Sequence, residues 1–303
     1  MGLAKENSNR GFIVSSLPLL DQFTAGCVAG GTATILLHPL DLLKTRFQAT
    51  VTNQHQNLVS VPRELVRIHR QGGLAGLYRG FSANFAGATT SWGVYFLLYR
   101  WIQSAWSTEP LAGWQTFVSS GSAGMLTVLV ANPLWMAKTR LCQPSLVVNP
   151  YQGLVDCLRK TWRTEGIRGL YRGLIPGLIG TSHGAVQFLA YEEMKKMYKR
   201  LHVSEKPKIS EFLLMSSASK IIAAAVTYPY QVVRCRLQLA PGPSDSFSPS
   251  TNLRNVIRNT WRGEGLGGFY KGIIPNTIRV LPGTCITFLV YEQLNAFFKK
   301  SAW

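Results

Sequence analysis

Three copies of one pattern constrain this chain more than any other feature. Each copy starts with a proline and ends with two basic residues separated by one position, and the copies occupy residues 39–46, 133–140 and 229–236. A glycine-rich phrase follows each copy at a similar distance, at residues 72–80, 165–173 and 264–272. Two linked motifs that recur three times at one period indicate three repeats of a single structural unit.

The distribution of charge favours a membrane protein. Asp, Glu, Lys and Arg make up 15% of the residues, against about 25% in an ordinary soluble protein. Segments without charge, or with few charges, are long enough to cross a hydrocarbon core, which takes about 20 residues of helix. These segments are residues 22–40, 80–99, 110–137, 173–191, 209–233 and 273–291.

Each repeat is expected to contain two membrane-spanning helices joined by a short amphipathic helix at the interface. In the first repeat we expect a span over residues 21–48, a surface helix over 62–70 and a return span over 81–103. Pro39 lies inside the first span and should kink it, because proline removes a backbone hydrogen bond. The corresponding surface helices are expected near residues 153–164 and 252–263.

The sequence therefore predicts an all-α membrane protein with six transmembrane helices in three pseudo-threefold repeats. We expect an N-terminal tail over residues 1–18, followed by repeats over 19–106, 107–203 and 204–299.

Nucleic acid is not an expected partner, although the net charge is +18. The basic residues sit at span ends and in the loops after each proline pattern, and there is no basic helix or DNA-binding motif. We expect part of this excess to meet anionic lipid headgroups where the short surface helices touch the bilayer.

An enzyme is not indicated either. The five cysteines are scattered without a CxxC pair, so they predict neither a disulfide framework nor a metal site. The sequence contains no nucleophile elbow, phosphate-binding loop or paired carboxylates within a span, and we expect no cofactor. A channel or proton leak stays open as an alternative, and it would show flux that does not saturate.

The two motifs resemble those of the mitochondrial carrier family, Px[DE]xx[KR]x[KR] followed by [DE]Gxxxx[YWF][KR]G. The resemblance implies a six-helix transporter of the mitochondrial inner membrane with its short helices on the matrix side. It also implies alternating access between a matrix-side and a cytoplasmic-side gate. Gly72 departs from the second motif, because it stands where the family has an acid.

The matrix gate implied by the resemblance is incomplete. Trp135 and Gln231 occupy positions where the family has acids. The family's pairing order then predicts one ion pair, one cation–π contact and one hydrogen bond, namely Asp41–Lys138, Trp135–Arg234 and Gln231–Lys44. Such a gate should be weaker than a ring of three ion pairs.

The cytoplasmic gate implied by the resemblance, [FY][DE]xx[KR], is also incomplete. Its positions are Arg100 and Gln103, Glu192 and Lys195, and Glu292 and Asn295. The pairing order would set Arg100 against Lys195, which is unfavourable unless Arg100 turns toward Glu292.

Two basic residues within spans are candidates for substrate binding. Lys220 lies nine residues before Pro229, and Arg279 lies seven residues after Gly272. At 1.5 Å per residue, these offsets place both side chains near mid-membrane, roughly 10–13 Å from the motifs. An ionisable residue there indicates function, although Lys220 could instead snorkel. Arg279 also matches the family's contact position on the sixth helix.

Four other residues are candidates for contact with a bulky ring system. Gly87 and Gly180 lie at the same offset as Arg279 from their own repeat glycines, and their small size would leave room for a ring. Trp92 would stack on a pterin, flavin or base, or else pack within the protein. His183 would hydrogen-bond substrate, or else a neighbouring helix.

Within the family, several stretches resemble carriers of folate and FAD. They are residues 91–96, 180–188, 218–221 and 227–234. The resemblance implies transport of FAD, tetrahydrofolate or both, each of which is anionic and carries a planar ring. Carriers of NAD or pyrimidine nucleotides, and peroxisomal nucleotide carriers, are the alternatives.

Overall fold

The computed structural model describes residues 19–50, 58–106, 113–143, 151–201, 209–239 and 252–301. The predicted tail over residues 1–18 lies outside them. The described residues form ten α-helices and no strand. The helices are α1 (Leu19–Ala49), α2 (Ser60–Leu77), α3 (Phe81–Ser104), α4 (Gly113–Cys142), α5 (Leu154–Leu170), α6 (Leu174–Ile179), α7 (Ser182–Leu201), α8 (Ile209–Leu239), α9 (Leu253–Gly268) and α10 (Ile273–Ser301).

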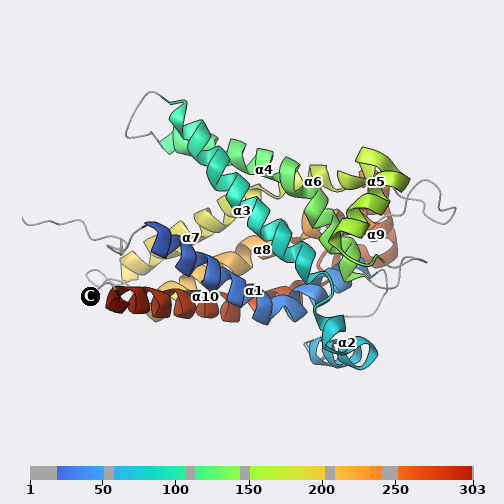
Figure 1. Cartoon of the computed structure of the whole chain (residues 1–303), viewed down its shortest axis with the longest axis horizontal. Coiled ribbons are helices and arrows are strands. Elements are labelled where there is room, and N and C mark those ends of the chain that lie inside the picture. The colour runs from blue at the N-terminus through green and yellow to red at the C-terminus, as the bar shows by residue number, and fades with distance from the viewer. Residues whose placement is uncertain are drawn as a thin grey trace, which may run out of the picture.

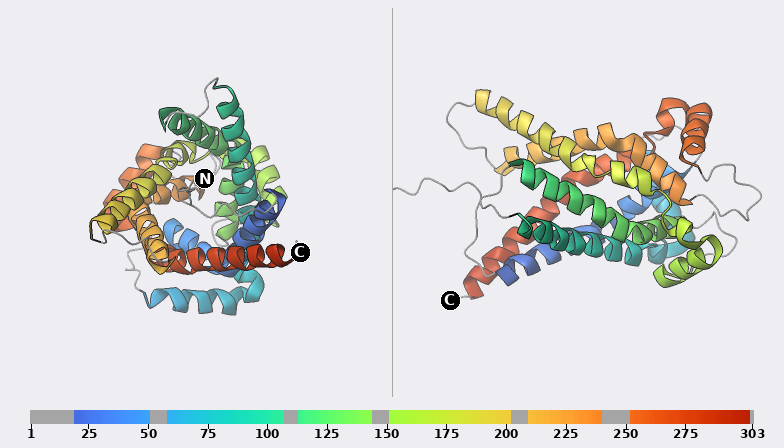
Figure 2. Two further views of the ribbon diagram at one scale, coloured as in Figure 1. Left: turned by 90° about the vertical axis from the view of Figure 1, so that its left-hand side faces the viewer. Right: turned by 90° about the horizontal axis from the view of Figure 1, so that it is seen from above.

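The long helices form a ring around a central axis (Figure 2, left). The last helix of each repeat packs on the first helix of the next, so α3 lies on α4, α7 on α8, and α10 on α1. The short helices α2, α5 and α9 lie together at one end of the ring (Figure 1). We call this end the surface-helix end. The predicted all-α architecture with three repeats is confirmed.

The surface helices run further than predicted, because each contains a reversal at a left-handed glycine. Gly73, Gly166 and Gly265 have φ values of 58°, 64° and 62° at equivalent places in the three repeats. A second glycine with positive φ ends each phrase, and glycine reaches this conformation without a Cβ clash. The turn from each surface helix to the following span therefore requires glycines at these positions.

The fourth span is interrupted, whereas the sequence predicted one continuous helix. It consists of α6 and α7, with the break at Gly180 and Thr181. The side chains of Thr181 and Ser182 donate to the carbonyls of Leu178 and Ile179, both at 2.7 Å. The same kind of bond also occurs within the unbroken helices α4 and α8, so these bonds accompany the break without explaining it.

The outer surface of the ring is strongly apolar. Large side chains on several helices are more than half exposed, including Leu36, Leu97, Phe117, Leu189 and Val226. Contiguous apolar surface of this kind marks contact with a membrane or a partner. Two described stretches, Gly113–Cys142 and Ser210–Leu239, reach a mean hydropathy of 1.3 and are long enough to cross a membrane.

The arginines that end the three proline patterns tie the repeats together at the surface-helix end. Each arginine donates from Nε to a backbone carbonyl near the end of the first helix of another repeat. The bonds are Arg46 to Cys142 (3.1 Å), Arg140 to Gln238 (3.0 Å) and Arg236 to Gln48 (3.1 Å). They form a cyclic ring, because the first repeat bonds the second, the second the third, and the third the first.

Two buried glutamates brace this arginine ring. Glu264 bonds both Arg236, at 2.8 Å, and Lys271, at 2.8 Å. Glu165 holds Arg140 and Arg172 in the same way in the second repeat. Gly72 removes the equivalent acid from the first repeat, so Arg46 enters the ring without this brace.

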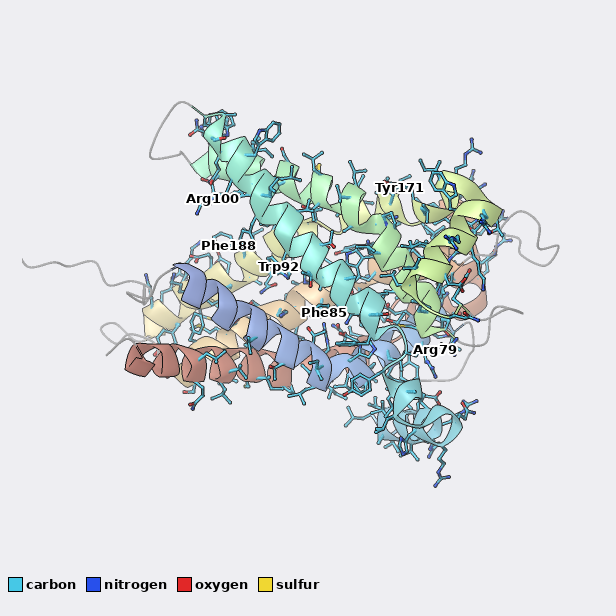
Figure 3. All side chains as sticks on the ribbon, in the orientation of Figure 1. Arg79, Phe85, Trp92, Arg100, Tyr171 and Phe188 are labelled. Carbon is cyan, nitrogen blue, oxygen red and sulfur yellow. The ribbon has the colours of Figure 1, made fainter. Side chains whose placement is uncertain are left out.

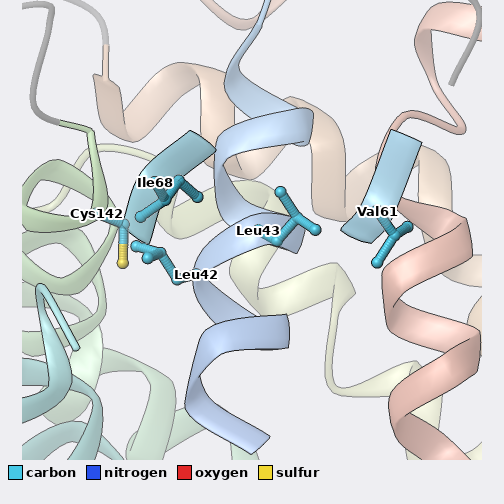
Figure 4. Packing of buried hydrophobic residues seen from close by; sticks show 5 residues of the cluster. All are labelled: Leu42, Leu43, Val61, Ile68 and Cys142. Atoms are coloured by element: carbon cyan, nitrogen blue, oxygen red, sulfur yellow. The ribbon is translucent and has the colours of Figure 1, made fainter. Parts of the chain in front are cut away.

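Apolar packing also fixes α2 to the ring. Leu42 and Leu43 of α1 are fully buried and belong to one cluster with Val61, Ile68 and Cys142 (Figure 4). Because Cys142 comes from α4, this cluster joins the first surface helix to the junction between two repeats.

Replacing Glu264 by Gln should destabilise the protein, because Arg236 and Lys271 would both remain buried without a counter-charge. Breaking a buried pair costs about 3–5 kcal/mol. Thermal unfolding of the purified protein in detergent should show a clear drop in the melting temperature. Glu64→Gln is the matched control, since Glu64 pairs with a mostly exposed Arg67. Equal melting temperatures for the two variants would contradict the bracing role.

Replacing Gly272 by Ala should also destabilise the protein. Gly272 has φ of 84°, and a Cβ there would lie 2.9 Å from the Lys44 carbonyl oxygen. A strained backbone conformation costs about 1–3 kcal/mol, before the clash is counted. Gly267→Ala is the control, because a Cβ at Gly267 meets nothing within 4 Å. The same unfolding measurement compares them, and an unchanged melting temperature for Gly272→Ala would be the contrary result.

Candidate binding cavity

A cavity of about 790 Å³ lies between the long helices. Its walls come from all three repeats, with residues from α1, α3, α4, α6, α7, α8 and α10. Ligand sites in proteins typically measure about 300–1,000 Å³, so the cavity is large enough for an extended small molecule.

The cavity wall is strongly basic. Among the described residues that line it, Asp41 is the one carboxylate, whereas five side chains are basic. The basic residues are Lys44, Lys138, Lys220, Arg234 and Arg279. A concave surface with one dominant sign of charge concentrates ions of the opposite sign, so this cavity favours anions.

Arg279 is held by Asp41. Its Nη1 lies 2.8 Å from Asp41 Oδ1, and one third of the Arg279 side chain is exposed. Its Nε is buried and has no hydrogen-bond partner among the described residues. Because a guanidinium has five N–H donors, Arg279 keeps donors for an anion while it is bound to Asp41.

This contact corrects the predicted ion pair between Asp41 and Lys138. Arg279 comes from α10, which packs directly along α1 and so brings the guanidinium to Asp41. Lys138 instead lies over the ring of Trp135 in its own helix, with Nζ 5.0 Å from the ring centroid.

The predicted cation–π contact between Trp135 and Arg234 is also replaced. Trp135 gives its ring face to Lys138, and its Nε1 donates to Ser91 Oγ at 3.0 Å. The predicted bond between Lys44 and Gln231 is present, since Lys44 Nζ donates to Gln231 Oε1 at 3.1 Å.

Side chains of the protein fill the space that we expected Gly87 and Gly180 to leave for a ligand ring. A Cβ at Gly87 would lie 3.5 Å from the indole of Trp135. At Gly180 it would lie 3.1 Å from the ring of Tyr230, whose hydroxyl donates to the Gly180 carbonyl at 3.2 Å. Both glycines therefore permit aromatic packing between helices, and Gly180 also lines the cavity.

The remaining predicted contact residues all line the cavity. His183 Nδ1 lies 2.8 Å from Thr227 Oγ1 of α8, so His183 hydrogen-bonds a neighbouring helix in this structure. Lys220 is exposed and has no ion-pair partner among the described residues. Trp92 is 64% exposed, midway along α3 (Figure 3), and it stacks on Phe96 with ring centroids 5.7 Å apart.

The structure does not bring the predicted cytoplasmic-gate residues together across the described helices. Lys195 pairs with Glu192 in its own helix at 3.6 Å. Arg100 is exposed near the far end of α3 (Figure 3), and Gln103 lies one turn further on. The side chains of Glu292 and Asn295 lie outside the described part of the structure.

Nothing in the described residues indicates a metal centre. They contain no group of three or more His, Cys, Asp or Glu side chains that could hold a metal ion. Burial raises the pKa of Cys157 on α5 to about 11, so this thiol stays protonated at neutral pH.

Sequence reasoning missed one aromatic contact in the cavity and the arginine ring at the surface-helix end. Tyr230 was not singled out, although it directly follows Pro229 and lies against Gly180. The arginine ring was missed as well, although an arginine ends all three proline patterns, which was a sufficient signal.

A family model described as "Mitochondrial carrier protein" matches residues 15–110, 109–202 and 205–302. The chain belongs to the mitochondrial carrier family. Members of this family are transporters, and the threefold ring around a basic cavity agrees with that role.

Curated relatives span nearly the whole chain. Folate transporter 1, chloroplastic, of Arabidopsis thaliana is 38% identical over 92% of this chain and 96% of its own length. The mitochondrial FAD carrier protein of Saccharomyces cerevisiae is 31% identical over 92% of this chain and 97% of its own length. A mitochondrial nicotinamide adenine dinucleotide transporter of the same yeast is 34% identical over 90% and 76%.

Replacing Asp41 by Asn should strengthen the binding of anions in the cavity. The change removes the one carboxylate that competes for Arg279 and keeps the shape of the side chain. We expect at least about tenfold tighter binding of FAD, since close like-charge contacts cost several kcal/mol. Equilibrium dialysis of the purified protein measures this, with Asp156→Asn on α5 as the control. Weaker binding would show that Asp41 positions Arg279 rather than competing for it.

Proposed function

We propose that this carrier moves FAD, tetrahydrofolate or both across the mitochondrial inner membrane by alternating access. The observation that carries the proposal is the cavity, whose lining has five basic residues and one acid among the described residues. Such a lining selects a cargo with more than one negative charge.

The chemistry of both cargoes fits this lining. FAD carries a diphosphate and folates carry glutamate carboxylates, and each also has a planar ring. The anionic part suits the free donors of Arg279 and the ammonium of Lys220, which has no ion-pair partner among the described residues. The exposed Trp92, stacked on Phe96, offers a flat aromatic surface for the ring.

The names of the relatives support this choice without ranking the two cargoes. One relative is named for folate, one for FAD and several for NAD. NAD is the second candidate, because it also combines a diphosphate with planar rings and its named transporters are similarly close to this chain.

We place the matrix gate at the surface-helix end. The residues proposed for it are Asp41, Lys44, Trp135, Lys138, Gln231 and Arg234, which line the cavity close to the arginine ring. The cytoplasmic gate would lie at the opposite end, with Arg100, Gln103, Glu192, Lys195, Glu292 and Asn295. The basic face of α2, with Arg63, Arg67 and Arg70, is proposed to contact anionic lipid headgroups.

Uptake of labelled FAD into liposomes that contain the purified protein tests the proposal. Unlabelled tetrahydrofolate, NAD and UTP serve as competitors. Saturable uptake that folate inhibits is the expected result. Uptake without saturation would indicate a channel, and exchange of NAD or UTP without FAD uptake would move the function to another cargo.

Arg279→Ala should reduce this uptake at least about thirtyfold, because a lost charge-assisted contact to a buried ligand costs about 2–5 kcal/mol. The variant should remain folded, which its melting temperature checks. Lys199→Ala, at an exposed position of α7, is the matched control and should keep normal uptake. Normal uptake by Arg279→Ala would remove Arg279 from the binding site.

A further inference from the structure

Three basic residues that line the cavity have no acidic partner in the described structure. Lys44, Lys138 and Arg234 occupy the same position in the three proline patterns. Lys44 bonds the amide of Gln231, and Lys138 lies over the indole of Trp135. Arg234 has neither an ion pair nor a hydrogen bond among the described residues.

The sequence explains why these three charges are not neutralised. The third position of the pattern is an acid in the first copy, Asp41, but is Trp135 in the second and Gln231 in the third. The remaining acid is engaged elsewhere, since Asp41 bonds Arg279 at 2.8 Å. None of the three bases therefore has a carboxylate within ion-pair distance in the described structure.

The three bases also converge in space. They come from α1, α4 and α8, which contact one another pairwise, and all three side chains line the same cavity. We call Lys44, Lys138 and Arg234 the floor bases, because they lie at the end of the cavity nearest the arginine ring. Like charges that share a partly dehydrated space repel one another unless an anion neutralises them.

The local packing leaves Arg234 available to a ligand. Its guanidinium carbon would lie 3.3 Å from a Cβ at Gly177, so the arginine rests against a bare stretch of α6. A larger side chain at Gly177 would occupy that space. Arg234 thus packs against α6, and its donors have no acceptor among the described residues.

We propose that the floor bases form a second anion subsite, which binds a phosphate or carboxylate of the cargo beyond Arg279. Arg279 reaches Asp41, one helical turn before Lys44, so it lies between Lys220 and the floor bases. The basic residues then form a continuous track from Lys220 through Arg279 to the floor. The bound anion takes the place of the two missing acids.

This inference rests on the proposed function and adds a requirement on the cargo. The cargo must carry at least two negative charges, one for Arg279 and one for the floor bases. The diphosphate of a dinucleotide or the two carboxylates of a folate glutamate meets the requirement, whereas a monoanion does not.

Gln231→Glu is the sharpest test, because it changes one amide to a carboxylate next to Lys44 without changing its shape. The new carboxylate should compete with the cargo for the floor bases. We expect FAD to bind about tenfold more weakly, as for other close like-charge contacts. The apo protein should melt at a higher temperature, since an ion pair replaces a hydrogen bond. Equilibrium dialysis and thermal unfolding measure the two effects.

Gln71→Glu is the matched control, because it makes the same chemical change on the exposed face of α2. It should leave FAD binding and the melting temperature unchanged. If Gln231→Glu raised the melting temperature but bound FAD as tightly as the unmodified protein, the floor bases would have a structural role and the subsite would be refuted. Arg234→Gln is the second variant, and it too should weaken FAD binding about tenfold.

Inorganic pyrophosphate separates this inference from the proposed function. If the unmodified protein bound neither FAD, tetrahydrofolate nor NAD, the proposed function would fail. Pyrophosphate should even then raise the melting temperature of the unmodified protein, and do so less in Gln231→Glu. An equal effect of pyrophosphate on both proteins, or no effect on either, would overturn the subsite.

Discussion

The ring of arginines at the surface-helix end is the interaction on which the rest of the structure depends. A helix leaves its last carbonyls without partners, and α1, α4 and α8 each end beside another repeat. Arg46, Arg140 and Arg236 satisfy these carbonyls from another repeat. The bond pattern is cyclic, so it closes one end of the helix ring, and the cavity exists because the helices meet there.

The cavity acquires its character from substitutions that remove charge. Trp135 and Gln231 take positions that the family's pattern gives to acids, and each engages a lysine without neutralising it. The resulting excess of basic residues is electrostatically unfavourable in an empty cavity, and a polyanionic cargo relieves it. The absence of acids at positions 135 and 231 thus both weakens the gate contacts and strengthens the attraction for anions.

Asp41 links the two parts of this design. Asp41 is the one acid in the described cavity lining, so it can neutralise a single base. In the structure this base is Arg279. Lys138 is left to Trp135, whose indole in turn covers Gly87 and bonds Ser91. The ion pair of Asp41 with Arg279 is therefore linked to contacts on α10, α4 and α3.

The sequence by itself determined the threefold repeat, the all-α class and the basic residues within the spans, because each follows from periodicity or from the identity of single residues. Only the tertiary structure decided that Arg279 bonds Asp41 and that aromatic rings cover Gly87 and Gly180. These features depend on which side chain of a neighbouring helix lies close enough to make the contact. The distances between helices decide this, and a local sequence pattern does not contain them.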